Sequence, residues 1–219
     1  MKGFFIAGTD TEIGKTYVTC LLMQHLAGEG HKVFGIKPIA SGCEETSMGL
    51  RSEDALAISE YASLGGIPYS LINRYQFAPA IAPHIAAEQA GTEISFELIQ
   101  QDVREASKYT DYLFVEGVGG WQVPLGKDGT VSDLAAKLEL NVILVVGIKL
   151  GCINHALLTT QDIQRKGLTL AGWIANRCDP NAEASDENIE TLKQHIDAPL
   201  IAEIGFKSHS LDPKIHFWD

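Results

Sequence analysis

The segment GTDTEIGKT at residues 8–16 constrains the fold of this chain more than any other feature. It follows a short apolar run, Phe4 to Ala7, and it precedes an apolar-rich stretch with helical spacing. A glycine-containing turn from a strand into a helix directs backbone N–H groups at an anion, and the helix dipole favours negative charge at the same place. We therefore predict a phosphate-binding loop, in which Lys15 reaches the outer phosphates and the Thr16 hydroxyl binds Mg²⁺.

The spacing of this loop departs by one residue from the common pattern, in which four residues separate the first glycine from Gly-Lys-Ser/Thr. Thr9 stands where that glycine belongs, and Gly8 lies one residue earlier. An ordinary turn with a chance Gly-Lys-Thr is the alternative, but the predicted strand and helix on either side favour phosphate binding. The difference in spacing concerns the shape of the loop and leaves the roles of Lys15 and Thr16 unchanged.

Strand and helix patterns alternate along the chain. Apolar runs rich in β-branched residues lie at 3–7, 32–36, 111–115, 141–147, 169–175 and 199–204, with a weaker run at 71–77. Helical spacing appears at 15–28, 52–63, 80–90, 95–108, 130–139, 154–166 and 185–196, with Ser52, Ser95, Thr130 and Ser185 as N-caps. Near-continuous apolar strands are typical of a parallel sheet that is buried on both faces. We predict one α/β domain over residues 1–219, a doubly wound, mostly parallel sheet of about seven strands like that of P-loop NTPases.

The charge and the composition argue against several classes of protein. The formal net charge is −11, whereas a nucleic-acid-binding surface is basic. The longest apolar run, Val142 to Ile148, is too short to span a bilayer, and the N-terminal apolar stretch is too brief for a signal peptide. The four cysteines form no C-x-x-C pair, which argues against structural zinc. We expect a cytoplasmic protein with reduced thiols that binds neither nucleic acid nor membranes.

Several polar residues fall where predicted strands end, and ligands bind beyond the carboxyl ends of the strands in such a sheet. Glu116 closes the segment DYLFVEG and is either a Mg²⁺-binding acid or a solvated acid at a strand end. Lys37, in KPIASG, is either a surface lysine or a cation that neutralises charge during phosphoryl transfer. Further residues at such ends are Lys149 to Asn154, Asn176 and Gly205.

Asp54 and Asn176 also have more than one interpretation. Asp54 follows Ser52 and Glu53 at a helix start, where compensation of the helix dipole is the simplest role. Asn176 begins NRCD, which is similar to an Asn-Lys-x-Asp guanine-recognition motif with Arg177 in place of lysine. Asn176 therefore either contacts a purine edge or is an ordinary turn residue.

Six segments together resemble the dethiobiotin synthetase family, from about Gly3 to Ile204. They are GTDTEIGKT, KPIASG, GLRSEDA, VEGVGGW, VILVVGIKLGCINHALLT and LAGWIAN. The variant spacing of the phosphate loop is part of that family's pattern. The resemblance implies an ATP- and Mg²⁺-dependent ligase of biotin biosynthesis, which converts 7,8-diaminononanoate and CO2 into dethiobiotin, ADP and phosphate. One amine forms a carbamate, ATP phosphorylates the carbamate, and the second amine closes the ring.

The same resemblance implies roles for individual residues. Lys15 and Lys37 are implied to be catalytic, with Lys37 at the carbamate and the γ-phosphate. Asp54 and Glu116 join Thr16 at the metal, a role for Asp54 that replaces dipole compensation. Residues implied to contact substrate are Ser41 and, across the interface of a homodimer, Cys152, Ile153 and Asn154 at the substrate carboxylate. Residues implied to bind ATP and its metal are Glu12, Ile13, Gly14, Lys15, Thr16, Tyr17, Asp54, Glu116, Gly117, Val118, Gly119, Asn176, Arg177, Gly205, Phe206 and Lys207.

Two other functions are alternatives to the synthetase activity. A ParA/MinD-like ATPase switch has a loop of the form Lys-Gly-Gly-x-Gly-Lys-Thr, but Asp10, Thr11 and Glu12 stand where Lys-Gly-Gly belongs. A GTP-binding module would use NRCD. A synthetase consumes ATP only when diamine and bicarbonate are both present, whereas a switch hydrolyses nucleotide without them.

Overall fold

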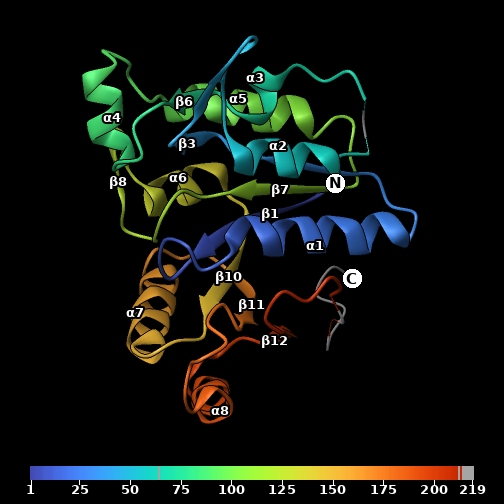
Figure 1. The fold of residues 1–219 in the computed structure, drawn as a ribbon, viewed down its shortest axis with the longest axis vertical. Coiled ribbons are helices and arrows are strands. Elements are labelled where there is room, and N and C mark those ends of the chain that lie inside the picture. The colour runs from blue at the N-terminus through green and yellow to red at the C-terminus, as the bar shows by residue number, and fades with distance from the viewer. Residues whose placement is uncertain (64, 212, 214–219) are drawn as a thin grey trace.

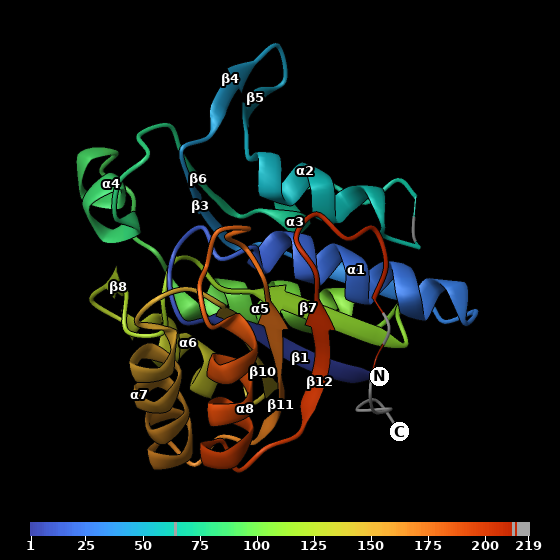
Figure 2. The same cartoon turned by 60° about the horizontal axis from the view of Figure 1, so that its bottom comes forward.

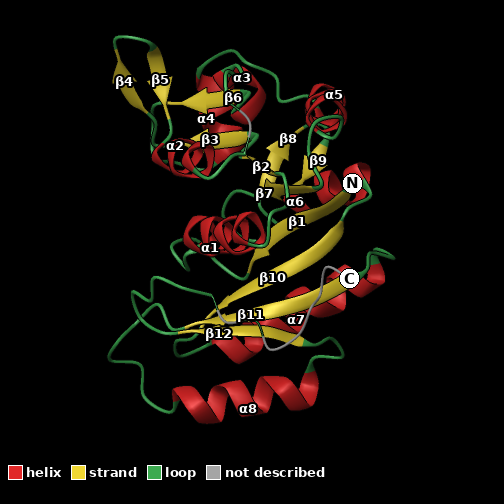
Figure 3. Ribbon diagram, turned by 90° about the vertical axis from the view of Figure 1, so that its right-hand side faces the viewer, coloured by secondary structure: helices red, strands yellow, loops and turns green. Residues whose placement is uncertain are grey.

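A six-stranded parallel sheet forms the centre of the protein, with the order β12-β11-β10-β1-β7-β2. The structure is a computed structural model that describes residues 1–63, 65–211 and 213. Figure 3 shows the strands side by side with helices on both sides of them. The strands of this sheet are β1 (Lys2–Gly8), β2 (Val33–Ile36), β7 (Tyr112–Glu116), β10 (Asn141–Gly147), β11 (Leu170–Asn176) and β12 (Leu200–Ile204). The prediction of a doubly wound, mostly parallel α/β sheet is therefore confirmed.

Alternate residues of β1 point to opposite faces of the sheet and enter two hydrophobic clusters. Phe4 and Ile6 pack with α1, whereas Phe5 and Ala7 pack with α5, α6, α7 and α8. This two-sided burial explains why the strands are apolar at nearly every position. The helices, labelled in Figure 1, are α1 (Lys15–Gly28), α2 (Glu53–Glu60), α3 (Tyr69–Ile72), α4 (Pro83–Gln89), α5 (Phe96–Ala106), α6 (Val131–Leu138), α7 (Cys152–Arg165) and α8 (Ser185–His195).

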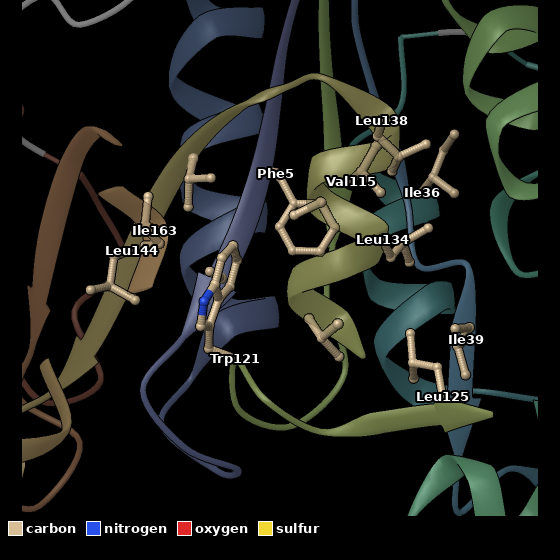
Figure 4. Close-up of a cluster of buried hydrophobic side chains, with 14 of the residues drawn as sticks. Phe5, Ile36, Ile39, Val115, Trp121, Leu125, Leu134, Leu138, Leu144 and Ile163 are labelled. Carbon is tan, nitrogen blue, oxygen red and sulfur yellow. The ribbon is translucent and has the colours of Figure 1, made fainter. Parts of the chain in front are cut away.

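Trp121 anchors the loop after β7 to the larger cluster. Its ring meets Phe5 edge to face, with 6.4 Å between ring centroids and an interplanar angle of 76°. Figure 4 shows this pair beside Leu134 and Leu138 of α6 and Val115 of β7. The indole N–H donates a 2.9 Å hydrogen bond to Asp162 of α7, so the polar end of the buried ring is also bonded. The loop is thereby held against the carboxyl end of the sheet.

The central sheet has one strand fewer than the seven or so that the sequence predicts, because the weak apolar run at 71–77 lies outside it. The run begins in α3, and its extended part pairs with residues after β2 instead. Buried Asn73 divides these two parts, since its side-chain amide donates to the carbonyl oxygens of Lys37 and Tyr75. The small sheets pair β3 (Ile39–Ser41) with β6 (Tyr75–Phe77), β4 (Glu44–Thr46) with β5 (Gly49–Arg51), and β8 (Pro124–Gly126) with β9 (Gly129–Thr130). Figure 2 shows the β4–β5 hairpin projecting from the body of the protein.

Three of the four predicted N-caps are confirmed. The side chains of Ser52, Ser95 and Thr130 each accept a hydrogen bond from a backbone N–H in the first turn of α2, α5 and α6. Ser185 is wrong as an N-cap because α8 already begins at this residue, after Ala184 in the left-handed conformation. The Ser185 hydroxyl instead donates to the carbonyl oxygen of Ala182 in the preceding turn. No helix in the described part of the chain is long and apolar enough to cross a membrane.

Candidate active site

The phosphate loop connects the carboxyl end of β1 to α1, which begins at Lys15. Gly14 precedes the helix with a φ of 81°, a left-handed conformation that favours glycine. A Cβ at this position would lie 2.4 Å from Nδ2 of Asn176, so β11 approaches the loop too closely for a larger residue. Among the described residues no side chain caps α1, and the N–H groups of its first turn are therefore available to an anion.

Lys15 is buried beside this loop, where its ammonium group donates a 2.8 Å hydrogen bond to the carbonyl oxygen of Asp10. Burial, together with the positive charge of Lys37, lowers the pKa of Lys15 to about 8. A buried cation close to another cation favours an anionic ligand, because the ligand offsets both charges. Lys15 thus has the position and the electrostatic environment of a phosphate-binding lysine.

Glu116 lies at the centre of a buried cluster at the end of β7, and its side chain has no exposed surface. Its Oε1 accepts hydrogen bonds from Thr16 Oγ1 at 2.7 Å and from Lys37 Nζ at 2.6 Å. Its Oε2 accepts a 2.9 Å hydrogen bond from Thr19, one turn further along α1. The structure thus brings together Thr16, Lys37 and Glu116 from α1, the end of β2 and β7. Thr19 was not among the predicted site residues, although its spacing of three from Thr16 places both on one helix face.

Asp54 joins this cluster from the first turn of α2, with Oδ2 3.0 Å from Lys37 Nζ. Burial favours the neutral form of Lys37, but the charges of Glu116 and Asp54 outweigh burial and raise the Lys37 pKa. Burial likewise raises the Asp54 pKa, but the charge and hydrogen bond of Lys37 outweigh it, and the pKa lies below its ordinary value. Asp54 therefore faces the cluster and also lies in the first turn of a helix. Its location is compatible both with a role in the metal site and with compensation of the helix dipole.

These residues line a cleft of about 800 Å³. Ser41 lies in the same cleft, and its hydroxyl is buried without a hydrogen-bond partner in the structure. Gly117 follows Glu116, and its carbonyl oxygen accepts a 3.2 Å hydrogen bond from Lys37. The remaining lining residues are Thr11, Glu12, Gly14, Lys15, Thr16, Tyr17, Ala40, Ala80, Ile81, Ala82, Pro83, Val118, Gly119 and Val123. Residues 80–83 and Val123 were missed because apolar side chains carry no chemical signal in a sequence.

The oxygen atoms of this cluster suit Mg²⁺ better than a softer metal. Mg²⁺ binds one or two carboxylates, keeps several waters and also binds substrate phosphates. Thr16, Asp54 and Glu116 supply a hydroxyl and two carboxylates beside the phosphate loop. Among the described residues, no group of three or more His, Cys, Asp or Glu could hold a metal by itself. The donor set therefore fits an ion that is completed by phosphate and water.

Asn176 lies at the end of β11 but outside the lining of the cleft. Its side chain is buried, and Nδ2 donates a 2.7 Å hydrogen bond to the carbonyl oxygen of Ile13 in the phosphate loop. Arg177 also lies outside the lining, and it forms ion pairs with Asp186 at 2.5 Å and Glu203 at 3.4 Å. The structure therefore shows Asn176 bonded to the phosphate loop and Arg177 engaged with acids of α8 and β12.

The late segment and the start of α7 are also separate from this lining. Gly205, Phe206 and Lys207 form a turn after β12, in which the Lys207 ammonium lies 5.3 Å from the Phe206 ring centroid. Cys152 is buried at the start of α7, Ile153 is partly buried and Asn154 is exposed. The structure places neither group beside Lys37 or Glu116 of the same chain.

Comparisons with known proteins agree with the sequence resemblance. The ATP-dependent dethiobiotin synthetase BioD of Pseudomonas aeruginosa is 47% identical over 205 residues, covering 93% of this chain and 90% of that protein. The ATP-dependent dethiobiotin synthetase BioD 1 of Escherichia coli strain K12 is 46% identical over 203 residues, covering 93% of this chain and 90% of that protein. These similarities extend through nearly the whole of both relatives.

Solved structures and a family model support the fold. The MinD cell division protein of Aquifex aeolicus has a TM-score of 0.57 and 16% sequence identity, covering 94% of this chain and 83% of the MinD chain. A family model described as an AAA domain matches residues 2–213. The similarity to MinD, at 16% sequence identity, shows the fold alone. The more similar sequence relatives show to which family with this fold the chain belongs. With its phosphate loop, its buried Glu116 cluster and this identity to relatives of similar length, the chain belongs to the ATP-dependent dethiobiotin synthetase family.

Proposed function

We propose that this protein catalyses the ATP- and Mg²⁺-dependent carboxylation and ring closure of 7,8-diaminononanoate. CO2 supplies the ureido carbon of dethiobiotin, and ADP and phosphate are released. The observation that carries the proposal is the convergence of Lys15, Lys37 and Glu116 in one cleft, with Thr16 and Asp54 beside them. Relatives that are 46–47% identical and are named ATP-dependent dethiobiotin synthetases support the same activity.

Phosphate and metal binding use the part of the cleft at the start of α1. Lys15 and the free N–H groups of the first turn bind the outer phosphates of ATP. Thr16, Asp54 and Glu116 hold Mg²⁺, which neutralises phosphate charge when it is bound. An anion beside Lys15 favours its charged form, so ATP binding raises the lowered pKa of this lysine.

Lys37 orients and neutralises the reacting anions. A carbamate and a γ-phosphate repel each other, and a buried ammonium between them reduces that repulsion as they react. Glu116 and Asp54 keep Lys37 charged in the free protein, so the cation is present before substrate arrives. The unpartnered Ser41 hydroxyl binds the diamine, whose two nitrogens are thereby held beside the activated carbon for intramolecular ring closure.

A second copy of the chain completes each active site. The whole chain acts as one P-loop NTPase-like synthetase domain in the cytoplasm, as a homodimer whose sites are shared between subunits. Leu150 before α7, and Asn154 and Leu158 in its first half, are exposed, and this surface suits a second copy that brings residues 152–154 to the neighbour's substrate carboxylate. Asn176, with one amide hydrogen bonded to Ile13, would contact the base through its remaining polar atoms, and residues 205–207 would also contact the nucleotide.

A coupled assay tests this function. ADP release is measured with ATP and Mg²⁺ alone, with diamine added, with bicarbonate added, and with both added. The synthetase requires both additions, and dethiobiotin is identified by mass. Steady ATP hydrolysis without diamine would instead support the ATPase switch, and a preference for GTP would support guanine recognition by residues 176–179.

A further inference from the structure

Thr19 is a fully buried polar residue that the proposed reaction leaves without a role. It lies on α1, one turn after Thr16, and its Oγ1 is 2.9 Å from Oε2 of Glu116. The same oxygen is also 2.9 Å from the carbonyl oxygen of Lys15, four residues earlier in the helix. A buried hydroxyl between a helix carbonyl and a site carboxylate therefore calls for an explanation.

The contact with the helix carbonyl is ordinary, but the contact with the carboxylate is not. Thr159 and Thr191 also donate to the carbonyl oxygen four residues earlier, in α7 and α8. A threonine hydroxyl has one hydrogen to donate, and an ionised carboxylate is a stronger acceptor than a neutral carbonyl. The Thr19 hydroxyl therefore donates its hydrogen to Glu116, which lies on β7 and is 97 residues away in the sequence.

The two oxygens of Glu116 have different tasks. Oε1 faces Thr16 and Lys37, which are the proposed metal-binding and catalytic groups, whereas Oε2 faces Thr19. The Glu116 side chain has no exposed surface, so bulk water does not replace a lost bond to Oε2. Removing the Thr19 hydroxyl would leave one carboxylate oxygen poorly satisfied, and rotation about the last side-chain torsion would move Oε1 away from its partners.

We infer that Thr19 is a positioning residue, whose buried hydroxyl fixes the orientation of the Glu116 carboxylate for Mg²⁺-dependent nucleotide binding and turnover. The inference rests on the proposed use of ATP and Mg²⁺ at Glu116. Partners that orient a metal ligand typically change metal affinity or activity by about 10- to 100-fold when they are removed. Thr19 therefore acts through Glu116, and its loss affects the Mg²⁺-dependent part of nucleotide binding.

Three variants separate this role from simple packing. Thr19→Val keeps the branched shape and removes the hydroxyl, whereas Thr19→Ser keeps the hydroxyl and removes a methyl group. Thr160→Val is the matched control, because buried Thr160 donates to the helix carbonyl of Leu157 in α7, away from the cleft. Circular dichroism melts show which variants fold. If Thr19→Val does not fold, Thr19→Ala replaces it in the same comparison with Thr19→Ser.

ADP affinity is measured by calorimetry with Mg²⁺ and with EDTA, and turnover is measured over a Mg²⁺ titration. For Thr19→Val we expect the Mg²⁺ concentration for half-maximal turnover to rise about 10- to 100-fold. The gain in ADP affinity from Mg²⁺ should fall in parallel, while ADP affinity in EDTA stays within about twofold because the phosphate loop is unchanged. Thr19→Ser and Thr160→Val should behave like the wild type in both measurements.

Several results would overturn the inference. One is a Thr19→Val protein with wild-type Mg²⁺ dependence, and another is a Thr19→Ser protein that is as impaired as Thr19→Val. A third is a Thr19→Val protein that loses equal ADP affinity with and without Mg²⁺. The last is a wild-type protein whose ADP affinity does not depend on Mg²⁺. The calorimetry also separates this inference from the proposed function. A wild-type protein that binds Mg²⁺ and ADP together but makes no dethiobiotin would refute the proposed function, and Thr19 would still be tested by binding.

Discussion

The two ends of the candidate nucleotide site differ in how their polar side chains are engaged. At the phosphate end, Lys37, Glu116 and Thr16 converge from separate elements in a buried cluster that faces one cleft. At the other end, Arg177 is paired with Asp186 and Glu203 at the protein surface, outside the lining of that cleft. The first arrangement fixes charges before a ligand arrives, whereas the second satisfies its charges locally. Single substitutions should therefore have large effects at the phosphate end and small effects around Arg177.

Substitutions in the phosphate loop should have the largest effect. Lys15→Ala or Thr16→Ala should lower turnover at least about 1000-fold, because each removes a group that is proposed to contact phosphate or metal. Dethiobiotin formation is measured under saturating substrate, and a thermal melt establishes that the variant is folded. Lys193→Ala is the control, since this lysine pairs with Glu190 and Glu203 and lies outside the lining of the cleft. Near-normal turnover in folded Lys15→Ala would remove this lysine from the mechanism.

Lys37→Gln should lower kcat about 100-fold, if the charge of Lys37 is used in the transition state. The substitution also leaves Glu116 and Asp54 without their shared cation, so the melt is recorded with the kinetics. Lys166→Gln removes a more exposed ion pair with Asp133 outside the cleft and should leave kcat unchanged. A change confined to the KM for diamine would make Lys37 a binding residue. It would also weaken the contrast between the phosphate end and the surroundings of Arg177.

Mixed dimers test whether a surface outside the cleft of one chain completes the site of another. Lys37→Ala and Asn154→Ala should each be nearly inactive as homodimers. In a mixed dimer of the two, one site carries both substitutions and the other carries neither. Random one-to-one assembly makes half of the dimers mixed, so about a quarter of all sites should be intact after joint refolding. Activity that stays at the level of the separate variants, with mixed dimers detected by mass, would contradict a shared site.

Asn176→Ala should have an intermediate effect, because this residue joins the two ends. The substitution removes the bond to the Ile13 carbonyl oxygen and the proposed contact with the base. We expect ATP affinity to fall by about 1–3 kcal/mol in titration calorimetry, the cost of leaving a buried partner unpaired. Tripolyphosphate, which lacks a base, separates the two causes: its affinity falls only if the loop is disturbed. Unchanged affinity for ATP would exclude Asn176 from the site.

Arg177→Ala should have the smallest effect. Its ion pairs are partly exposed, and pairs of this kind contribute about 0–1 kcal/mol to the free energy of unfolding. We expect ATP affinity within about twofold of the wild type, measured by the same titration. A loss as large as that of Asn176→Ala would show that Arg177 contacts the nucleotide, and the proposed contrast between the two ends would then be wrong.

Much of the local structure follows from the amino-acid sequence alone. The strand before the phosphate loop, helix 15–28 and the caps at Ser52, Ser95 and Thr130 follow from periodicity and capping, which act over a few residues. The resemblance to dethiobiotin synthetases also predicted Lys37, Asp54 and Glu116 as site residues, and these three side chains lie together in the structure. These features can be predicted from the sequence because each depends on residues that are neighbours in the chain or on a motif of contiguous residues.

The contacts between distant segments depend instead on the tertiary structure. Thr16 bonds to Glu116 across 100 residues of sequence, and Asn176 bonds to Ile13 across 163 residues. Such contacts depend on the order of strands in the sheet, which local periodicity does not specify. The same reason explains why residues 75–77 pair with β3 outside the central sheet, and why Thr19, an ordinary helical threonine by sequence, lies against the buried carboxylate of Glu116.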